Sequence, residues 1–320
     1  MYLVFDVGGT FIKYAWMDVD GNIEDSGKIP TMRKDNNTIE DFIDAIGKIY
    51  DEFKQRGTVE GIAMDVPGQV DVENGIVYGG GAIRYLDRVN LQEVIGKRCD
   101  GVRVSVENDG KCAALAEVWR GNAKDVNNAC VLIFGTGIGG GIIIDRKVHH
   151  GNRMVAGELS WHICDMKRED VDHLVPETEL STVEDVFDTL SYFDTVHCGT
   201  APLVHRVAKE KGLKDEEVSG ELIYEWANAG DAIAINALED TYFSIAKLCF
   251  NMCVTIDPDI ILIGGGISAE PKFLQGIQRY IDKIKRVTEI YSGVKIDVCK
   301  YHNRSNLLGA LYNFKQKYHC

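Results

Sequence analysis

The sequence contains little proline and none of the features of a secreted or membrane-spanning chain. Only 6 of its 320 residues are proline, against 33 glycines, which favours tight glycine turns between regular elements over a disordered chain. No apolar run approaches the roughly 18 residues that a membrane helix needs, and no basic region precedes the apolar segment Tyr2–Phe5. The nine cysteines form no Cys-x-x-Cys pair, so we expect reduced thiols in a cytoplasmic protein.

Positive charge is also scarce. Asp and Glu number 49 against 35 for Lys and Arg, the formal net charge is −14, and no basic block stands out. We therefore expect no nucleic-acid partner. An anionic cofactor stays open, because backbone N–H groups and a metal ion can bind phosphate without lysine or arginine.

Apolar segments of strand length alternate with segments of helical periodicity, which is typical of the α/β class. Strands are predicted at Tyr2–Phe5, Phe11–Met17, Gly61–Val66, Val102–Val106, Ala129–Phe134, Ile142–Asp145, Ile260–Ile263 and Val294–Val298. Helices are predicted at Ile39–Phe53, Lys111–Trp119, Ile233–Ile256, Lys272–Arg286 and Asn306–Phe314, and residues 164–230 are predicted to be mostly helical.

Two segments of the chain share one layout. Both VFDVGGTFIKYAWMD and VLIFGTGIGGGIIID contain an apolar strand, a glycine-threonine turn, a second apolar strand and an acid. This similarity predicts an internal duplication and two similar α/β halves. The alternative is a coincidence of glycines.

Three glycine turns each follow an apolar strand: Gly8-Gly9-Thr10, Gly135–Gly141 and Gly264–Gly266. Glycine lets bare backbone approach a phosphate closely, although one such turn is usually only structural. Three of them, two with threonine, predict nucleotide-phosphate binding. No Gly-Lys-Ser/Thr of a P-loop follows, and the second turn leads into a strand rather than the helix of a dinucleotide site.

Two aspartates lie where strands are predicted to end. Asp6, just before the first glycine turn, can hold Mg²⁺ or cap the turn. Asp109 can accept a proton from an alcohol, with Asn108 beside it to bind a polyol, or can instead be the N-cap of the next helix.

Glu158 and Trp161 lie in a compact segment of polar and aromatic residues that suits a sugar. The alternative is that this segment only begins a helix or strand and that Trp161 is buried.

Together these motifs resemble the ROK family of sugar kinases, repressors and open reading frames over nearly the whole chain. Asp6–Thr10 with Lys13 is similar to its first phosphate motif, and Gly135–Gly141 to its second. Glu107-Asn108-Asp109 resembles its segment with a sugar-binding Asn and a catalytic Asp. Asp257-Pro258 through Gly266 resembles its adenosine motif.

The resemblance implies a two-domain actin-like ATPase (ribonuclease H-like) fold with duplicated halves. We expect a small domain at 1–118, completed by a C-terminal helix at 305–320, and a large domain at 119–304. An ATP-dependent hexokinase-type reaction with Mg²⁺, commonly in a homodimer, is implied, with Asp109 as the base. The expected sugar contacts are Asn108, Glu158, Trp161 and Gly68. The expected nucleotide contacts are Asp6, Gly8, Gly9, Thr10, Lys13, Gly135, Thr136, Gly137, Gly264, Gly265 and Gly266, with Asp6 also at the Mg²⁺.

This chain departs from the family pattern at the sugar pocket. Trp161 stands where the family has a zinc-binding, sugar-contacting His, and the cysteine-rich zinc motif that follows is missing. The usual sugar-binding Asn is not evident within residues 79–85. We therefore expect no structural zinc, with Trp161 as an apolar anchor in its place. A substitute zinc site would have to use His162, Cys164, His197 and Cys198.

Other functions remain as alternatives. A sugar-responsive repressor is disfavoured by the net charge and by the absence of a DNA-binding segment before Asp6. An actin-like ATPase without a sugar substrate is disfavoured by Asn108, Asp109 and Glu158. Among kinases, glucose or another hexose is the default substrate, and N-acetylmannosamine and β-glucosides such as cellobiose are the alternatives.

Overall fold

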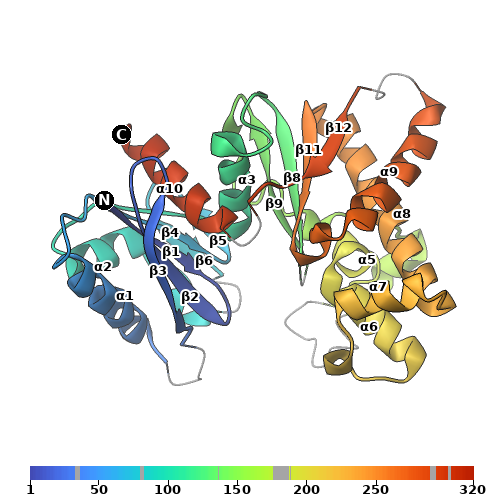
Figure 1. Ribbon diagram of the computed structural model, residues 1–320, viewed down its shortest axis with the longest axis horizontal. Helices are drawn as coiled ribbons and strands as arrows, with labels where there is room; N and C mark the ends of the chain where they lie inside the picture. Colours follow the sequence, from blue (N-terminus) through green and yellow to red (C-terminus); the bar gives the residue numbers. More distant parts are fainter. Residues whose placement is uncertain are drawn as a thin grey trace. The chain divides into compact units, whose positions relative to one another are not determined.

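The computed structural model describes residues 1–32, 37–79, 83–135, 137–175, 187, 189–288, 293–301 and 304–320. The chain divides into two compact units, whose sheets and helices can be followed in Figure 1. The first unit comprises residues 1–125, 146–156 and 303–320, and the second comprises 126–145 and 157–302. The division therefore falls at residue 125 rather than at 118, and the segment 146–156 returns to the first unit.

The sheet of the first unit has the strand order β3-β2-β1-β4-β7. These strands are β1 (Tyr2–Val7), β2 (Phe11–Met17), β3 (Ile23–Pro30), β4 (Gly61–Val66) and β7 (Val104–Asn108). β2 pairs antiparallel with both β1 and β3, whereas β1, β4 and β7 are parallel. The carboxyl ends of the three parallel strands therefore meet at one edge of the sheet, where sites in α/β folds commonly form.

Helices cover both faces of this sheet. Side chains of α1 (Ile39–Phe53) and α2 (Leu91–Arg98) share one hydrophobic core with the sheet, through residues such as Phe42, Ile95 and Phe5. On the other face, α10 (Ser305–Tyr318) contacts α3 (Asp109–Arg120) and strands β1, β4 and β7. A short hairpin, β5 (Gln69–Asp71) and β6 (Ile76–Tyr78), follows β4, and β10 (Lys147–Val148) lies in the segment 146–156.

In the second unit, four strands follow the order β9-β8-β11-β12. They are β8 (Ala129–Phe134), β9 (Ile138–Ile144), β11 (Ile260–Gly264) and β12 (Lys295–Val298). An antiparallel hairpin followed by two parallel strands is the arrangement of β2-β1-β4-β7 as well, so the predicted duplication is confirmed. The helices are α5 (Asp194–Cys198), α6 (Thr200–Lys211), α7 (Gly220–Asn228), α8 (Ala232–Ile256) and α9 (Pro271–Ile284).

The second glycine turn is shorter than predicted. β9 begins at Ile138, and its glycines Gly139, Gly140 and Gly141 pair with β8 rather than forming a loop. Gly140 has a φ of 145°, and a Cβ there would lie 1.9 Å from the carbonyl oxygen of Val131, so the close backbone approach requires glycine. Strands β3, β5 and β6 and helix α2 were not predicted, because β3 and α2 are mostly polar and β5 and β6 are only three residues long.

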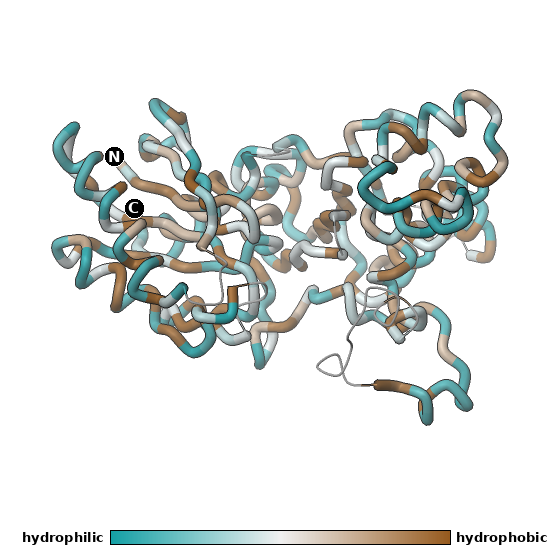
Figure 2. Tube along the Cα trace, turned by 90° about the horizontal axis from the view of Figure 1, so that it is seen from below, coloured by the Kyte–Doolittle hydropathy of each residue, from teal (hydrophilic) through white to brown (hydrophobic). Residues whose placement is uncertain are grey.

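Each unit has its own hydrophobic core. Figure 2 shows hydrophobic stretches alternating with hydrophilic ones along the trace, as expected of elements with one buried face. Among the helices that the structure describes, none is both long and apolar enough to cross a membrane.

Candidate functional site

Asn108 and Asp109 lie at the junction between β7 and α3. The side-chain oxygen of Asn108 accepts a hydrogen bond from the backbone N–H of Lys111 at 3.1 Å, so Asn108 is the N-cap of α3. The alternative interpretation of Asp109 as the N-cap is therefore wrong. Asp109 is instead the first helical residue, and it is half-buried at the carboxyl edge of the sheet.

Hydrogen bonds fix the carboxylate of Asp109. Its Oδ1 accepts from the backbone N–H of Gly110 at 2.8 Å and from the Asn108 amide at 3.0 Å. The same amide donates to the carbonyl oxygen of Gly68 at 3.0 Å. Asn108 thus ties Asp109 to the turn after β4, which holds a carboxylate in one orientation, as a general base requires.

Asp6 is buried near the end of β1 and is bonded to a cation. The Lys13 ammonium lies 2.8 Å from its Oδ2, and the Asn306 amide donates to its Oδ1 at 3.4 Å. Lys13 itself is 46% exposed, so its ammonium can also reach a ligand in solvent. The adjoining turn is held by the Thr31 hydroxyl, which donates to the carbonyl oxygen of Gly8 at 2.7 Å.

Asp65, on β4, lies between these residues and was missed by the sequence analysis. It is fully buried, and neither of its carboxyl oxygens has a hydrogen-bond partner. Burial raises the pKa of Asp65 well above its ordinary value, and the negative charges of Asp6 and Asp109 raise it further. The available signal was an acid inside the otherwise apolar strand GIAMDV.

In the second unit, the turn between β8 and β9 contains two predicted phosphate-binding glycines. The Gly135 N–H donates to the carbonyl oxygen of Gly137 at 3.0 Å, and the Gly135 carbonyl accepts from Thr200, at the start of α6, at 2.8 Å. A Cβ at Gly135 would meet nothing within 4 Å, whereas one at Gly137 would lie 3.0 Å from the Thr195 hydroxyl. Thr136, between them, lies outside the described residues.

In the third glycine turn, close packing requires two of the glycines. Gly265 has a φ of 103°, and a Cβ there would lie 2.0 Å from the carbonyl oxygen of Phe134. At Gly264 a Cβ would lie 2.6 Å from the side chain of Ile133. Only Gly266 faces open space, with nothing within 4 Å of a Cβ. Close packing therefore accounts for Gly264 and Gly265 without a ligand.

Glu158 and Trp161 flank a short 3-10 helix, η2 (Leu159–Trp161). Its Ser160 hydroxyl accepts from the Ile138 N–H at 2.9 Å and donates to the Ile138 carbonyl at 3.0 Å, which ties this segment to the start of β9. Trp161 is 49% exposed and contacts Phe193 edge-on at 5.8 Å between ring centroids. The alternative interpretation of a buried Trp is therefore wrong, and Trp161 as an apolar anchor stays a prediction.

The residues of the substitute zinc site have other partners. His162 Nδ1 lies 2.8 Å from the Asp194 carboxylate, and His197 Nε2 lies 2.7 Å from the carbonyl oxygen of Ser191. Within the described ranges, no group of three or more His, Cys, Asp or Glu is arranged to hold a metal. The expectation of no structural zinc stays a prediction.

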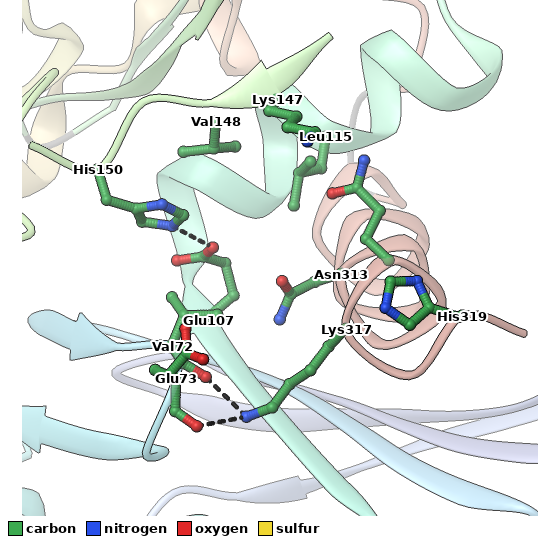
Figure 3. Close-up of a pocket in the computed structure, with 11 residues that line it drawn as sticks. Val72, Glu73, Glu107, Leu115, Lys147, Val148, His150, Asn313, Lys317 and His319 are labelled. Atoms are coloured by element: carbon green, nitrogen blue, oxygen red, sulfur yellow. Dashed lines mark hydrogen bonds and ion pairs between the residues drawn. The ribbon is translucent and has the colours of Figure 1, made fainter.

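A pocket of about 630 Å³ in the first unit was not foreseen (Figure 3). Glu107 and His150 face each other in it, with Glu107 Oε2 and His150 Nε2 2.7 Å apart. On another side, the Lys317 ammonium donates to the carbonyl oxygens of Val72 and Glu73 at 2.7 and 2.9 Å. The pocket brings together β7, α3, α10 and the segment 146–156, but Asn108 and Asp109 are not among the residues that line it.

Comparison with known proteins agrees with these motifs. The sequence matches the model of the ROK family over residues 2–317. A β-glucoside kinase of Klebsiella pneumoniae is 30% identical over 316 residues, covering 98% of this chain and 96% of the relative. A β-glucoside kinase of Listeria monocytogenes (serovar 1/2a) is 31% identical over 315 residues, covering 98% and 97%.

A solved structure extends the comparison to the fold. The ROK family protein from Streptococcus pneumoniae TIGR4, crystallised in complex with sucrose, is similar to this chain with a TM-score of 0.82 and 29% identity. The similarity covers 99% of both chains, which includes both units. This chain belongs to the ROK family.

Proposed function

We propose that the protein is an ATP-dependent sugar kinase in which Asp109 accepts the proton of the attacking sugar hydroxyl. Phosphoryl transfer to an alcohol needs a positioned carboxylate for that proton and positive charge around the phosphates. The observation that carries the proposal is the carboxylate of Asp109, oriented by two donors at the carboxyl end of β7. The two β-glucoside kinases that are similar to this chain over 98% of its length are sugar kinases.

The sugar contacts follow from the groups around this base. Both amide hydrogens of Asn108 are bonded, to Gly68 and Asp109, so its oxygen has one lone pair left to accept a sugar hydroxyl. The backbone of Gly68, in the same unit, adjoins this amide. In the second unit we assign Glu158 to sugar hydroxyls and the half-exposed indole of Trp161 to an apolar sugar face.

The nucleotide contacts belong to the glycine turns. In the first unit we assign Gly8, Gly9, Thr10 and Lys13 to the phosphates, because the turn exposes backbone beside a half-exposed ammonium. In the second unit Gly135, Thr136 and Gly137 have the same role. Gly266 adjoins the nucleotide in open space, and Gly264 and Gly265 shape that turn.

The donor chemistry at Asp6 fits Mg²⁺. A carboxylate oxygen is the ligand that this hard cation prefers, and Mg²⁺ usually combines one or two carboxylates with phosphate oxygens and waters. When bound, the cation neutralises charge on the transferred phosphate. Asp6 therefore remains our proposed magnesium ligand.

For the substrate we propose a β-glucoside such as cellobiose, phosphorylated on a hydroxyl of its glucose unit. Two relatives that cover nearly the whole chain are β-glucoside kinases, and sucrose, another disaccharide, is bound in the S. pneumoniae relative. Glucose and N-acetylmannosamine are the next candidates. We further propose that the enzyme is cytoplasmic and forms a homodimer.

One experiment tests substrate and mechanism together. ADP release is measured with ATP and Mg²⁺ over cellobiose, other β-glucosides, glucose and N-acetylmannosamine, for wild type, Asp109→Asn and the control Asp71→Asn. The Asp71 carboxylate bonds to Asn74 within an exposed turn, so Asp71→Asn should behave as wild type. Asp109→Asn should lower kcat by about 10²–10⁴-fold with little change in ATP affinity. No sugar-dependent ADP release in wild type would contradict the kinase, and a variant retaining a tenth of kcat would exclude Asp109 as base.

A further inference from the structure

Three carboxylates lie side by side on one face of the first sheet. Asp6 on β1 is the register partner of Asp65 on β4, and Asp65 is the partner of Glu107 on β7. Their strand neighbours, such as Phe5 and Met64, belong to the core shared with α1 and α2. Because side chains alternate along a strand, the three acids face the α3 and α10 side.

Two of the three acids have partners. Glu107 accepts from the Asn108 backbone N–H at 2.8 Å, and its other oxygen lies 2.7 Å from His150 Nε2. Asp6 has the Lys13 ammonium at 2.8 Å and the Asn306 amide. Asp65, between them, is fully buried, and both of its carboxyl oxygens lack a partner.

An unpartnered buried carboxylate is expensive, and it persists only when something neutralises it or when function requires it. The neighbours of Asp65 do not supply that charge. Asp6 lies near Asp65, but two carboxyl groups can share a hydrogen bond only when one of them carries a proton. Asp109 adds further negative charge. The positive charge of Lys13 acts on Asp65 in the opposite direction, but its ammonium is bonded to Asp6.

We propose that Asp65 is a second carboxylate ligand, which together with Asp6 holds one divalent cation, Mg²⁺ in the working enzyme. The inference rests on the proposed role of Asp6 and adds a residue that the family motifs did not identify. Nucleotide phosphates and water complete the coordination, as is usual for Mg²⁺.

The test measures metal binding directly. Mn²⁺, a hard cation that reports its free concentration by electron paramagnetic resonance, is titrated into the full-length protein with saturating ADP. Asp65→Asn keeps the side chain's size and removes its charge. We expect its dissociation constant for Mn²⁺ to rise by about tenfold or more, because ligand charge sets affinity for such cations. Asp6→Asn should weaken Mn²⁺ similarly.

A matched control is Glu107→Gln, which removes the other flanking carboxylate of the same row. Its two carboxylate oxygens already bond to the Asn108 N–H and to His150, so Mn²⁺ affinity should stay within twofold of wild type. The melting temperature without divalent ions gives a second measurement: Asp65→Asn should melt above wild type, because the cost of burying an unpartnered carboxyl group beside Asp6 is removed. If Asp65→Asn does not fold, Asp65→Ser carries the same measurements.

The outcomes separate this inference from the proposed function. Wild-type Mn²⁺ affinity in Asp65→Asn, with Asp6→Asn weakened, would overturn the role of Asp65, leave Asp6 as a ligand and indicate a protonated Asp65. Unchanged affinity in both variants, or no Mn²⁺ binding by wild type, would overturn the whole cation site. Normal Mn²⁺ binding without sugar-dependent ADP release would instead refute the kinase and leave the cation site standing.

Discussion

The polar side chains at the carboxyl end of β7 act as a connected set. Glu107 holds His150, its neighbour Asn108 caps α3, and Asn108 in turn orients Asp109. Each contact uses a different atom, so Glu107 and Asn108 have separate structural tasks, and Asp109 is held in place by Asn108. A substitution at any of these residues should therefore shift the positions of the other side chains as well as change the local charge.

The Glu107–His150 contact gives a stability prediction. His150→Ala would leave a buried carboxylate oxygen of Glu107 without its partner, which costs about 1–3 kcal/mol of unfolding free energy. The adjacent His149 is exposed, so His149→Ala should change stability by less than about 0.5 kcal/mol. Urea denaturation of the two variants checks this. Equal stability of both would show that the Glu107 contact contributes nothing.

The second glycine turn gives a binding prediction. Gly135→Val places a side chain in open space, so the fold should be preserved while the ATP phosphates are excluded. We expect the dissociation constant for ATP to rise roughly tenfold or more, about 1.4 kcal/mol, with a smaller effect on the sugar. Gly137→Val would test this less cleanly, because its Cβ meets Thr195 and Ser160.

The control for Gly135→Val is Gly293→Val, another open glycine of the second unit, which should bind ATP as wild type does. Calorimetric titration of both variants decides the matter. Unchanged ATP affinity in Gly135→Val would mean that this turn has only a structural role.

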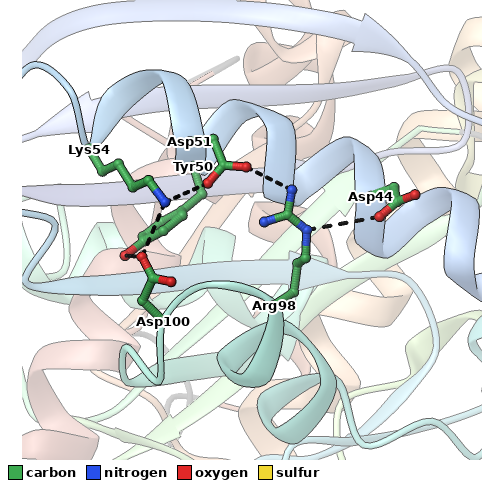
Figure 4. Close-up of polar contacts among 6 residues, drawn as sticks. All are labelled: Asp44, Tyr50, Asp51, Lys54, Arg98 and Asp100. Carbon is green, nitrogen blue, oxygen red and sulfur yellow. Dashed lines mark hydrogen bonds and ion pairs between the residues drawn. The ribbon is translucent and has the colours of Figure 1, made fainter.

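At the scale of elements, α1 and α2 are joined by a group of ion pairs on the surface of the first unit (Figure 4). Arg98 of α2 lies 2.8 Å from the Asp51 carboxylate of α1. Lys54, just after α1, lies 2.7 Å from Asp51 and 3.2 Å from Asp100. The bonds from Arg98, and then from Lys54, lower the pKa of Asp51 to about 2.

This shift predicts how the α1–α2 contact responds to pH. A carboxyl whose pKa is depressed in the folded state contributes its full stability above its ordinary pKa of 3.8, and loses it as pH falls toward 2. The stability difference between wild type and Asp51→Asn should therefore be constant from neutral pH to about pH 5 and smaller by pH 3.

Because these side chains are partly exposed, 1 M salt should also reduce that difference. Asp44→Asn is the matched control, since its carboxylate is 3.9 Å from Arg98 and its effect should be small throughout. Denaturation midpoints at several pH values provide the measurement. A difference that grows on acidification would contradict the assignment.

At the scale of the whole molecule, each unit has a main sheet built on the same plan and its own core. The family's zinc element would belong to the second unit, where Cys198 is buried and Cys164 half-buried. Burial raises the pKa of the Cys198 thiol well above its ordinary value and that of Cys164 to about 11. Zinc binds thiolates, so a zinc ion at this place would have to displace both thiol protons.

We therefore expect purified protein to hold much less than one zinc per chain. Kinase activity should return fully after chelation once Mg²⁺ is restored, because the second unit folds through its hydrophobic core. Elemental analysis alongside the activity assay provides the check. Stoichiometric zinc, lost together with activity on chelation, would revive the site of His162, Cys164, His197 and Cys198.

The sequence by itself determined the elements whose causes are local. Helix α1 has its predicted ends because Thr38 and Asp41 form a capping box and the apolar spacing is helical up to Phe53. Strands β2, β4 and β8 are likewise as predicted, since each is a short apolar or β-branched run between turns. The order of glycine turns and acids was enough to indicate the family.

Tertiary structure decided what depends on residues far apart in the chain. β3 has no apolar run and forms because it pairs with β2. Gly265 needs to be glycine because of Phe134, more than a hundred residues earlier, and the exposure of Trp161 depends on what packs around it. Asp65 lacks a hydrogen-bond partner only once β1, β4 and β7 have come together, because its possible partners lie on other strands and helices.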